Sequence, residues 1–578
     1  MKKYIISVLA GLAVLTGCQN LDLNPLSEGS SENWYSSEQE IKLSLNALYN
    51  PLLWYMEVCR WYNTDRWTDD WNQRDKVYDW VAGNENGNKS EVIKPWANSY
   101  KGISRANTII YSLENVKDKI SDAQLKIYDA EARFFRASFY SYLIMLYGDV
   151  PYYEGRVTLD EAYKMGRVSR DYVLDKIYAD LDIAADGLPK AYSDVQRITK
   201  GTAYAMKARV ALWMSDWQTC ADAAKACMDL NVYSLHPDFR ELFLSKTKKS
   251  SELVFELPNS IALDHPAYYD EDKDRWGASV KSFYSRTAGG NNVAQPSWEL
   301  FFAFPCTDGK YCDESPLYDP ADPFKDRDPR LAETFVKFGS EHLDIIYDPR
   351  CSASKVTKVS TGSLVTNKDS RKTDNWASFN GMTLRKGVDE DFQGDNLSDK
   401  NTTVIRYADV LLMYAEAMNE LGLAATDATV LNALNTVRAR AYGKGVNDTG
   451  YPKITETGQT ALRRIIRLER RCELAWENRR WFDLIRWRVC EDAVTTPYYQ
   501  LPDVDKMEAN EAAGYWIFPK DFRPVIKNNS IVNIEGLENF PVYFKKIVGR
   551  NFTTKSYLFP IPSKERIVCP NLTQNPGY

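Results

Sequence analysis

Apolar residues recur every three or four positions along much of this chain, which is the pattern of amphipathic helices that bury one face. The stretch 125–147 shows it with Phe135, Phe139 and Leu146, and Gly148 follows as a helix stop. Neighbouring stretches are rich in small residues and joined by short turns, so we expect helix pairs in a tetratricopeptide-like arrangement. The same periodicity predicts further helices at 38–58, 171–188, 200–214, 216–230, 405–421, 427–442 and 459–490.

Helical periodicity is lost in several long segments, where Gly, Pro, Asp and Asn become frequent. A segment as long as 231–400 is not one structureless connection, so we expect a subdomain packed on the helices. The predicted fold is mainly α, a single compact unit in which a tetratricopeptide-like helix-pair scaffold carries a large loop-rich α+β half. Its predicted parts are an N-terminal scaffold at 34–230 with a Trp-rich loop at 59–98, a loop-rich subdomain at 231–400, returning scaffold helices at 401–490 and a loop-rich segment at 491–578.

The first residues carry the pattern of an export signal. Lys2 and Lys3 precede an apolar run from Ile5 to Leu15, which is too short to remain as a transmembrane helix. Leu15-Thr16-Gly17-Cys18 follows and resembles the bacterial lipobox, in which the cysteine is diacylated and the preceding peptide is removed. We expect a lipoprotein signal peptide at 1–17, a lipidated tether at 18–33 and membrane attachment only through the lipid on Cys18.

Composition narrows the function classes. The chain has 578 residues, of which 44% are hydrophobic and 26% charged, a globular rather than disordered composition. A formal net charge of −6 indicates no basic face, so we expect no nucleic-acid partner. Three scattered histidines argue against metal sites and histidine catalysis, and we expect no cofactor. The acidic run 264–274 lacks EF-hand spacing, so a solvated loop is favoured and a structural Ca²⁺ is the alternative.

The cysteine spacing indicates no zinc site. Cys306 and Cys312 flank a Thr-Asp-Gly turn, where a disulfide and two free thiols both remain open. The other cysteines that lie in helical patterns are expected to be buried thiols.

Six stretches, in order along nearly the whole chain, resemble the SusD/RagB family of outer-membrane nutrient-binding lipoproteins of Bacteroidetes. They are the lipobox followed by Leu21-Asp22-Leu23-Asn24-Pro25, Tyr100 to Asn107, Glu131 to Ala137 running to Tyr147-Gly148-Asp149-Val150-Pro151, Arg406 to Ala417, Glu469 to Trp487, and Phe559-Pro560-Ile561-Pro562 running to Tyr578.

The resemblance implies a role as well as a fold. Members of this family are non-catalytic, lie on the cell surface at the outer membrane, and bind oligosaccharide or polysaccharide. They cap a SusC-like TonB-dependent transporter and deliver the glycan to it. The sequence departs from the family in its export signal, because Gln19-Asn20-Leu21-Asp22 holds one acid where surface lipoproteins of this phylum often carry several.

Tryptophan is concentrated early in the chain: seven of its sixteen tryptophans fall within residues 34–96. Indoles stack on the C–H faces of sugars, and flanking carboxylates and arginines bind hydroxyls. The predicted glycan cradle is Asp65, Trp67, Asp70, Trp71 and Trp80. The alternative is that these indoles plug the loop onto the helices. By analogy with starch-binding relatives, a second wall would come from Trp276, Tyr284, Trp298 or Trp376, with Arg385 and Arg371 as hydroxyl donors.

The acidic residues Glu469, Glu473 and Glu477 are spaced to share one helix face, among many arginines. We expect a structural charge network, in which arginines lower the carboxyl pKa values, the wrong direction for a general acid. Two other functions remain open: a peptide- or other nutrient-binding lipoprotein like the RagB side of the family, and a surface glycoside hydrolase, for which no motif is visible.

Overall fold

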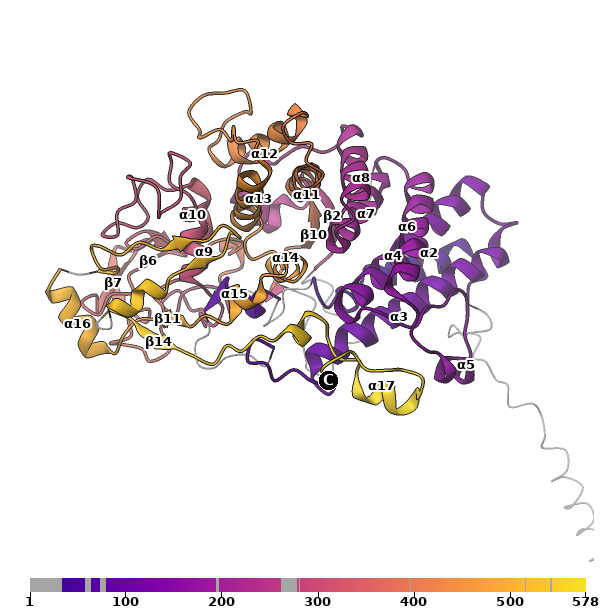
Figure 1. The fold of residues 1–578 in the computed structure, drawn as a ribbon, viewed down its shortest axis with the longest axis horizontal. Helices are drawn as coiled ribbons and strands as arrows, with labels where there is room; N and C mark the ends of the chain where they lie inside the picture. Colours follow the sequence, from indigo (N-terminus) through magenta and orange to yellow (C-terminus); the bar gives the residue numbers. More distant parts are fainter. Residues whose placement is uncertain are drawn as a thin grey trace, which may run out of the picture.

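The computed structural model of this chain describes residues 34–57, 64–72, 80–193, 197–260, 278–279, 281–394, 397–514, 516–540 and 543–578 (Figure 1). The predicted signal peptide, the tether with Cys18, the acidic run 264–274 and Trp276 lie outside these residues.

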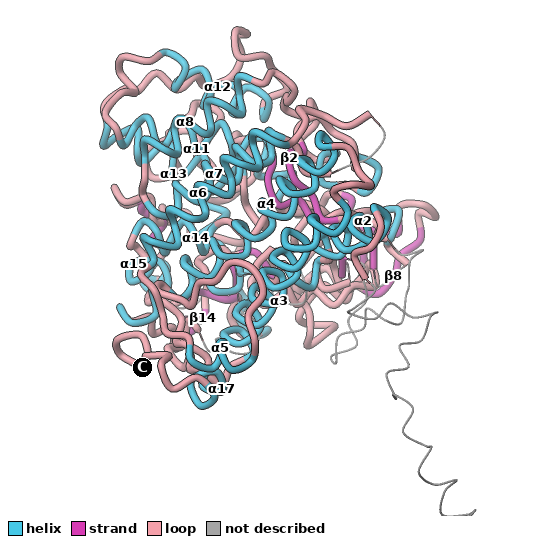
Figure 2. Tube along the Cα trace, turned by 90° about the vertical axis from the view of Figure 1, so that its right-hand side faces the viewer, coloured by secondary structure: helices cyan, strands magenta, loops and turns pink. Residues whose placement is uncertain are grey.

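The scaffold is a continuous row of helices in which each packs on the next (Figures 1 and 2). In order, the row consists of α3 (Ser90–Ser112), α4 (Asp122–Tyr147), α6 (Arg170–Gly187), α7 (Lys200–Met214), α8 (Trp217–Asp229) and α11 (Tyr407–Glu420). At one end of the row, α12 (Ala428–Ala441) and α13 (Gln459–Glu473) pack on α11. At the other end, α2 (Glu38–Asn46) packs on α3 and α4. The mainly helical fold is thereby confirmed, and the row is compatible with a tetratricopeptide-like array.

Local signals set the ends and the spacing of these helices. Ser121 caps α4 by accepting a hydrogen bond from the backbone N–H of Gln124, and Gly148 ends the helix with a φ of 74°. That φ strains any residue with a Cβ, so glycine suits the stop. Gly102 of α3 lies against Phe139 of α4, where a Cβ would come within 2.3 Å of the ring. The two helices therefore approach more closely than a larger residue would allow.

The loop-rich half leaves and rejoins the scaffold at one place. β2 (Leu253–Leu257) pairs antiparallel with β10 (Thr402–Arg406), and Leu257 lies opposite Thr402. Both strands pack on α7, and β10 also contacts α11. The chain between them forms a four-stranded antiparallel sheet, β5 to β8, and several shorter elements. These elements are β3 (Ala278–Ser279), β4 (Gln295–Pro296), α9 (Trp298–Ala303), α10 (Pro329–Thr334), β5 (Glu341–His342), β6 (Ile345–Ile346), β7 (Lys355–Lys358), β8 (Ser363–Thr366) and β9 (Leu397–Ser398).

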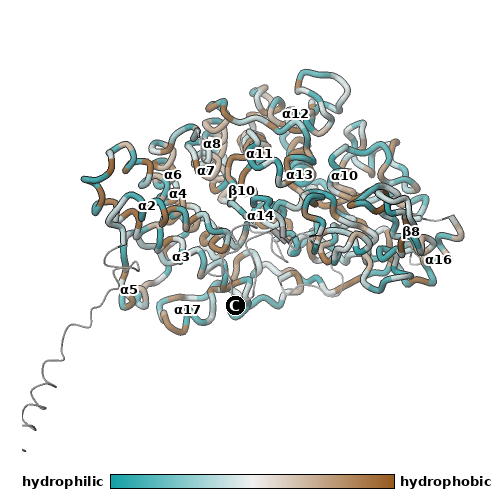
Figure 3. Tube along the Cα trace, turned by 180° about the vertical axis from the view of Figure 1, so that it is seen from behind, coloured by the Kyte–Doolittle hydropathy of each residue, from teal (hydrophilic) through white to brown (hydrophobic). Residues whose placement is uncertain are grey.

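A second apolar core fills the loop-rich half. Helix α13 joins it to the scaffold core, because Leu462 and Ile466 belong to the scaffold core while Leu468 and Cys472 belong to the second. Hydrophobic and hydrophilic residues are interspersed along the scaffold helices (Figure 3). The C-terminal segment adds apolar side chains to the second core from β11 (Tyr498–Gln500), α16 (Val504–Ala512), β12 (Val525–Ile526), β13 (Val532–Asn533) and the loops between them. Strand β14 (Lys545–Ile547) pairs with β11, and the chain then forms α17 (Ser563–Val568) on the scaffold side.

Three predicted boundaries are wrong. Helix α2 ends at Asn46 instead of 58 and is followed by two short 3-10 turns, the second of which begins at Pro51. Helix α3 begins at Ser90, so the last part of the predicted 59–98 loop is helical. The stretch 459–490 is broken after Glu473, and α14 (Arg480–Trp487) and α15 (Cys490–Val494) follow. Left-handed backbone at Trp476 and Asn478 makes that break.

Cys306 and Cys312 are buried free thiols, which decides between the two alternatives left open by the sequence. Across the described residues, no helix is both long and apolar enough to cross a bilayer. The same part of the chain contains no cluster of three or more His, Cys, Asp or Glu side chains arranged to hold a metal ion.

Candidate functional site

The described part of the Trp-rich loop is anchored in the protein interior by charge. It includes a 3-10 turn (Thr64–Trp67), strand β1 (Trp71–Asn72), which pairs with β4, and the residues from Trp80 onward. Arg480 of α14 donates two hydrogen bonds of 2.8 Å to the Asp69 carboxylate. Arg471 of α13 donates to Asp70 at 2.8 Å. All four side chains are buried, so the loop is bound to the scaffold by fully desolvated ion pairs.

The loop carboxyls differ in charge state because their neighbours differ. Burial alone would raise the pKa of Asp69, but Arg471 and Arg480 outweigh it and lower the pKa to about 2. Burial, with a smaller contribution from the nearby Asp70 charge, raises the pKa of Asp65 to about 7. Asp65 accepts a hydrogen bond from the backbone N–H of Asn478, 3.2 Å away. Both carboxyls therefore face protein groups.

The prediction that Trp67, Trp71 and Trp80 stack on glycan is not supported by their burial. Each indole is at most 4% exposed. The Trp67 and Trp80 rings both pack edge-on against Trp481, at 5.6 Å between centroids. Trp71 stacks on Trp476 at 5.0 Å. Protein rings already cover the faces of these indoles. The structure therefore agrees with the alternative interpretation, in which the indoles pack the loop against the scaffold.

Among the predicted aromatic residues that the structure describes, Trp376 is the accessible one, with 52% of its surface exposed. It lies on a turn between β8 and β9, where the Asp374 carboxylate accepts a hydrogen bond from the Trp376 backbone N–H at 2.7 Å. The other Asp374 oxygen accepts from Arg286 Nη2 at 3.1 Å. An exposed indole thus lies on a turn held by a half-buried ion pair, an arrangement that offers an apolar face beside polar donors and acceptors.

The remaining predicted residues lie in other surroundings. Trp298 is buried in the second core, with its ring 4.6 Å from Phe518. Tyr284 is buried too, and its hydroxyl donates to a backbone carbonyl. Their assignment to an open second wall is therefore corrected. Arg371 is half-buried over the Phe379 ring at 4.7 Å, and Arg385 pairs with Glu333 of α10 at 3.5 Å.

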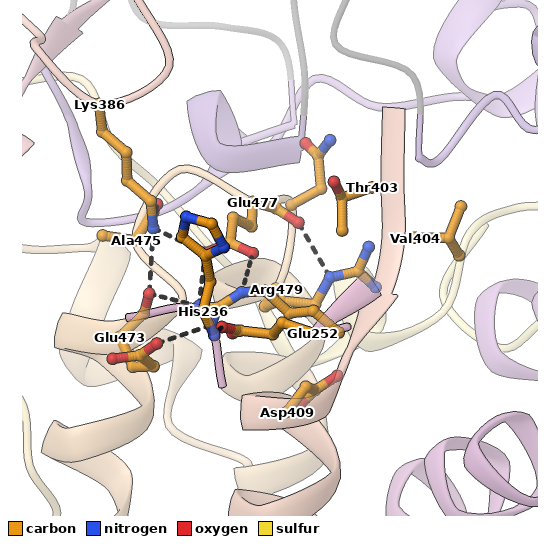
Figure 4. A network of polar contacts seen from close by, with 12 residues as sticks. His236, Glu252, Lys386, Thr403, Val404, Asp409, Glu473, Ala475, Glu477 and Arg479 are labelled. Atoms are coloured by element: carbon orange, nitrogen blue, oxygen red, sulfur yellow. Dashed lines mark hydrogen bonds and ion pairs between the residues drawn. The ribbon is translucent and has the colours of Figure 1, made fainter. Parts of the chain in front are cut away.

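A buried charge cluster lies where the scaffold meets the loop-rich half (Figure 4). Arg406 Nη1 donates to Glu252 at 2.7 Å and to Glu473 at 2.6 Å. Lys386 Nζ donates to Glu477 at 2.6 Å. The predicted charge network is confirmed, although Glu477 lies beyond the end of the helix that carries Glu473.

The charge state of this cluster suits a structural role. Burial alone would raise the pKa of Glu473, but Arg440 and Arg406 outweigh it and hold that pKa well below its usual range. The carboxyl of Glu473 is fully buried. A general acid needs a raised pKa and contact with substrate, so Glu473 has neither property.

Two residues beside Trp376, Asp374 and Arg286, were not predicted from the sequence. Asp374 had a local signal, because an Asp two residues before Trp376 favours a turn closed by its own side chain. Arg286 had none, since its pairing with Asp374 depends on the folded path of the chain between them.

Comparisons with known proteins agree with this fold. Residues 252–578 match the SusD family, and residues 21–212 match a family described as starch-binding and associating with the outer membrane. A SusD-like protein of Formosa agariphila, P2, is 25% identical over the full length of both chains. A SusD-like carbohydrate-binding protein of Bacteroides fragilis has a TM-score of 0.72 at 24% identity, over 93% of this chain and 99% of its own. A laminarin-binding SusD-like protein has a TM-score of 0.62 at 20% identity, over 94% and 100% of the two chains. Because one family match alone covers more than half of the sequence, this chain belongs to the SusD family.

Proposed function

We propose that this protein is a non-catalytic, cell-surface lipoprotein of the outer membrane that captures oligosaccharide or polysaccharide. The observation that carries the proposal is the exposed Trp376 indole beside the Arg286–Asp374 ion pair. Family membership supports it, since one matching family is described as starch-binding and a structural neighbour is described as laminarin-binding.

The proposed binding mode is stacking combined with hydrogen bonds. The indole of Trp376 receives the C–H face of one sugar ring, and Asp374 and Arg286 bind hydroxyls at its edge. A shallow polar surface exchanges water hydrogen bonds for protein ones, so each contributes roughly 1 kcal/mol. We expect modest affinity, which suits a protein that must release its glycan.

The proposed partner is a SusC-like TonB-dependent transporter, to which the glycan is delivered. Exposed apolar side chains on α5 (Leu159–Lys164) and α17 support docking through these two helices. The two helices lie side by side in Figures 1 and 2, and Asn571, in the loop after α17, donates a hydrogen bond of 2.7 Å to the Lys164 carbonyl of α5. Leu159 is 72% exposed and Ile567 is 77% exposed. A lipid on Cys18 would raise the local concentration of the protein at the transporter.

A panel of purified glycans tests the proposal. Calorimetry with laminarin, starch and xyloglucan should show binding to at least one, and Trp376→Ala should weaken that binding at least tenfold. Tyr111→Ala is the matched control, because Tyr111 is an exposed aromatic of the N-terminal scaffold. Release of reducing ends during incubation would contradict the non-catalytic role, and unchanged affinity of Trp376→Ala would contradict the site.

A further inference from the structure

A pocket separate from the Trp376 surface lies on the scaffold side of the molecule, where the α6–α7 connection meets β2. Its volume is about 330 Å³, at the lower end of small-molecule pockets. Tyr192 and Arg197 come from the connection, Tyr233 from the loop after α8, and Phe255 and Glu256 from β2. Its lining shares no residue with the Trp376 surface, so the two sites are separate in the described part of the chain.

The charges around this pocket are unbalanced. Arg197 is paired, because its Nη2 donates to Glu131 at 2.7 Å and its Nη1 to Asn46 at 2.7 Å. Lys190 and Lys249 line the exposed rim, and within the described residues neither ammonium group has an acidic partner. The pocket therefore presents two cations to a ligand.

The acidic residue of the pocket, Glu256, compensates the charge of these two lysines only weakly. Glu256 accepts hydrogen bonds of 3.3 Å from Asn401 Nδ2 and Thr403 Oγ1. Burial raises the pKa of Glu256 to about 7, so the carboxyl is largely protonated in mildly acidic solution. A protonated carboxyl donates a hydrogen bond and does not repel an anion.

The two tyrosines that line the pocket differ in their hydrogen bonding: the Tyr233 side chain is held in place, whereas the Tyr192 hydroxyl has no hydrogen-bond partner among the described residues. Tyr233 is held by a hydrogen bond of 2.8 Å to Thr199, and its ring lies against Gly201, where a Cβ would come within 2.4 Å. The Tyr192 hydroxyl is buried and has no hydrogen-bond partner among the described residues. A buried hydroxyl without a partner is costly, so a ligand group at this point would be favourable.

We propose that this pocket binds a carboxylated sugar, a hexuronic acid residue, by its carboxylate at Lys190 and Lys249 and by its ring between tyrosines. The aromatic rings match the C–H face of a pyranose, and the Tyr192 hydroxyl and Glu256 supply hydrogen-bonding groups for its hydroxyls. The pocket accommodates one such residue at a chain end, which distinguishes it from the open surface at Trp376.

Ligand-observed NMR on the purified chain tests this site with two matched pairs of probes, glucuronate against glucose and galacturonate against galactose. We expect millimolar binding of at least one uronate and at least tenfold weaker binding of its neutral partner. Lys190→Ala combined with Lys249→Ala should weaken uronate binding at least fivefold, and Tyr192→Phe should weaken it further. Lys506→Ala removes an exposed lysine on α16 and should leave it unchanged.

The Trp376→Ala variant separates this site from the proposed glycan surface. It should bind the uronate as the wild type does. Loss of uronate binding in Trp376→Ala, equal binding of the neutral sugar, or full binding by the double lysine variant would each overturn the assignment. Both lysines lie at the exposed rim, so the double variant should keep its melting temperature, and a lowered one would be resolved with Lys190→Gln and Lys249→Gln.

Discussion

Arg480 of α14 and Asp69 of the Trp-rich loop form a two-point ion pair in the protein interior, with both hydrogen bonds at 2.8 Å. The two residues are 411 positions apart, so this contact joins the C-terminal scaffold to the N-terminal loop. Arg471 reaches the same loop through Asp70. The loop is thus a structural joint between distant parts of the chain.

Asp69→Asn should destabilise the protein strongly, because it leaves Arg480 and Arg471 buried without full charge compensation. Breaking a buried pair of this kind costs about 3–5 kcal/mol. Urea unfolding would measure the change. Asp186→Asn serves as the control, since Asp186 forms an exposed ion pair with Lys126, and it should leave the unfolding midpoint unchanged. Similar midpoints for both variants would contradict the structural role of Asp69.

Trp67→Ala and Trp376→Ala should have opposite effects. Truncating the buried Trp67 opens a cavity and should cost about 3–5 kcal/mol of stability, with glycan affinity per folded molecule unchanged. Truncating the exposed Trp376 should leave the melting temperature nearly unchanged and weaken glycan binding. Thermal unfolding and calorimetry on both variants decide the matter. A Trp67→Ala protein that is stable yet fails to bind glycan would restore the loop as the binding surface.

Asp65→Asn should become more stable relative to the wild type as pH rises. The pKa of Asp65 is about 7 in the folded protein and about 4 in an unfolded chain, so the folded state holds an extra proton between these values. Folding stability contributed by this group is present below pH 4 and is lost as pH rises through 7. The difference in unfolding free energy should change by up to about 1.4 kcal/mol per pH unit in that window.

Denaturant unfolding at pH 5, 6, 7 and 8 measures this difference. Asp505→Asn on the exposed start of α16 should run parallel to the wild type across the same series. A constant difference between Asp65→Asn and the wild type would show that Asp65 titrates normally.

Ile567→Asp combined with Leu159→Asp should weaken association with the outer-membrane transporter. Both side chains are exposed, so the folded protein should tolerate the charges while an apolar interface would not. Co-purification of the transporter from native membranes measures the effect, with Leu364→Asp on strand β8 as the control because Leu364 is also exposed. Equal recovery with both variants would exclude the α5–α17 surface.

Local pattern predicted the scaffold well and the site poorly. Helix α7 begins at Lys200 and ends at Met214 as predicted, because caps and periodicity act within a few residues. The burial of Trp67 depends on Trp481, far along the chain, and no local signal distinguishes a buried indole from an exposed one. Trp376 was among the predicted aromatic residues, and its role in glycan binding stays a prediction. The ion pair between Arg286 and Asp374 beside it could be found only in the folded protein.

The antiparallel pairing of β2 with β10 brings the two ends of a long insertion together, so its length and sequence can change without moving the scaffold. That freedom has a specific limit. Arg330 and Lys386 come from the insertion and form ion pairs with Glu473 and Glu477, which stay with the scaffold and also pair with Arg406. A transplanted recognition half from a relative should therefore fold on this scaffold only when it supplies two cations at the same places, a rule that can guide the exchange of glycan specificity between such proteins.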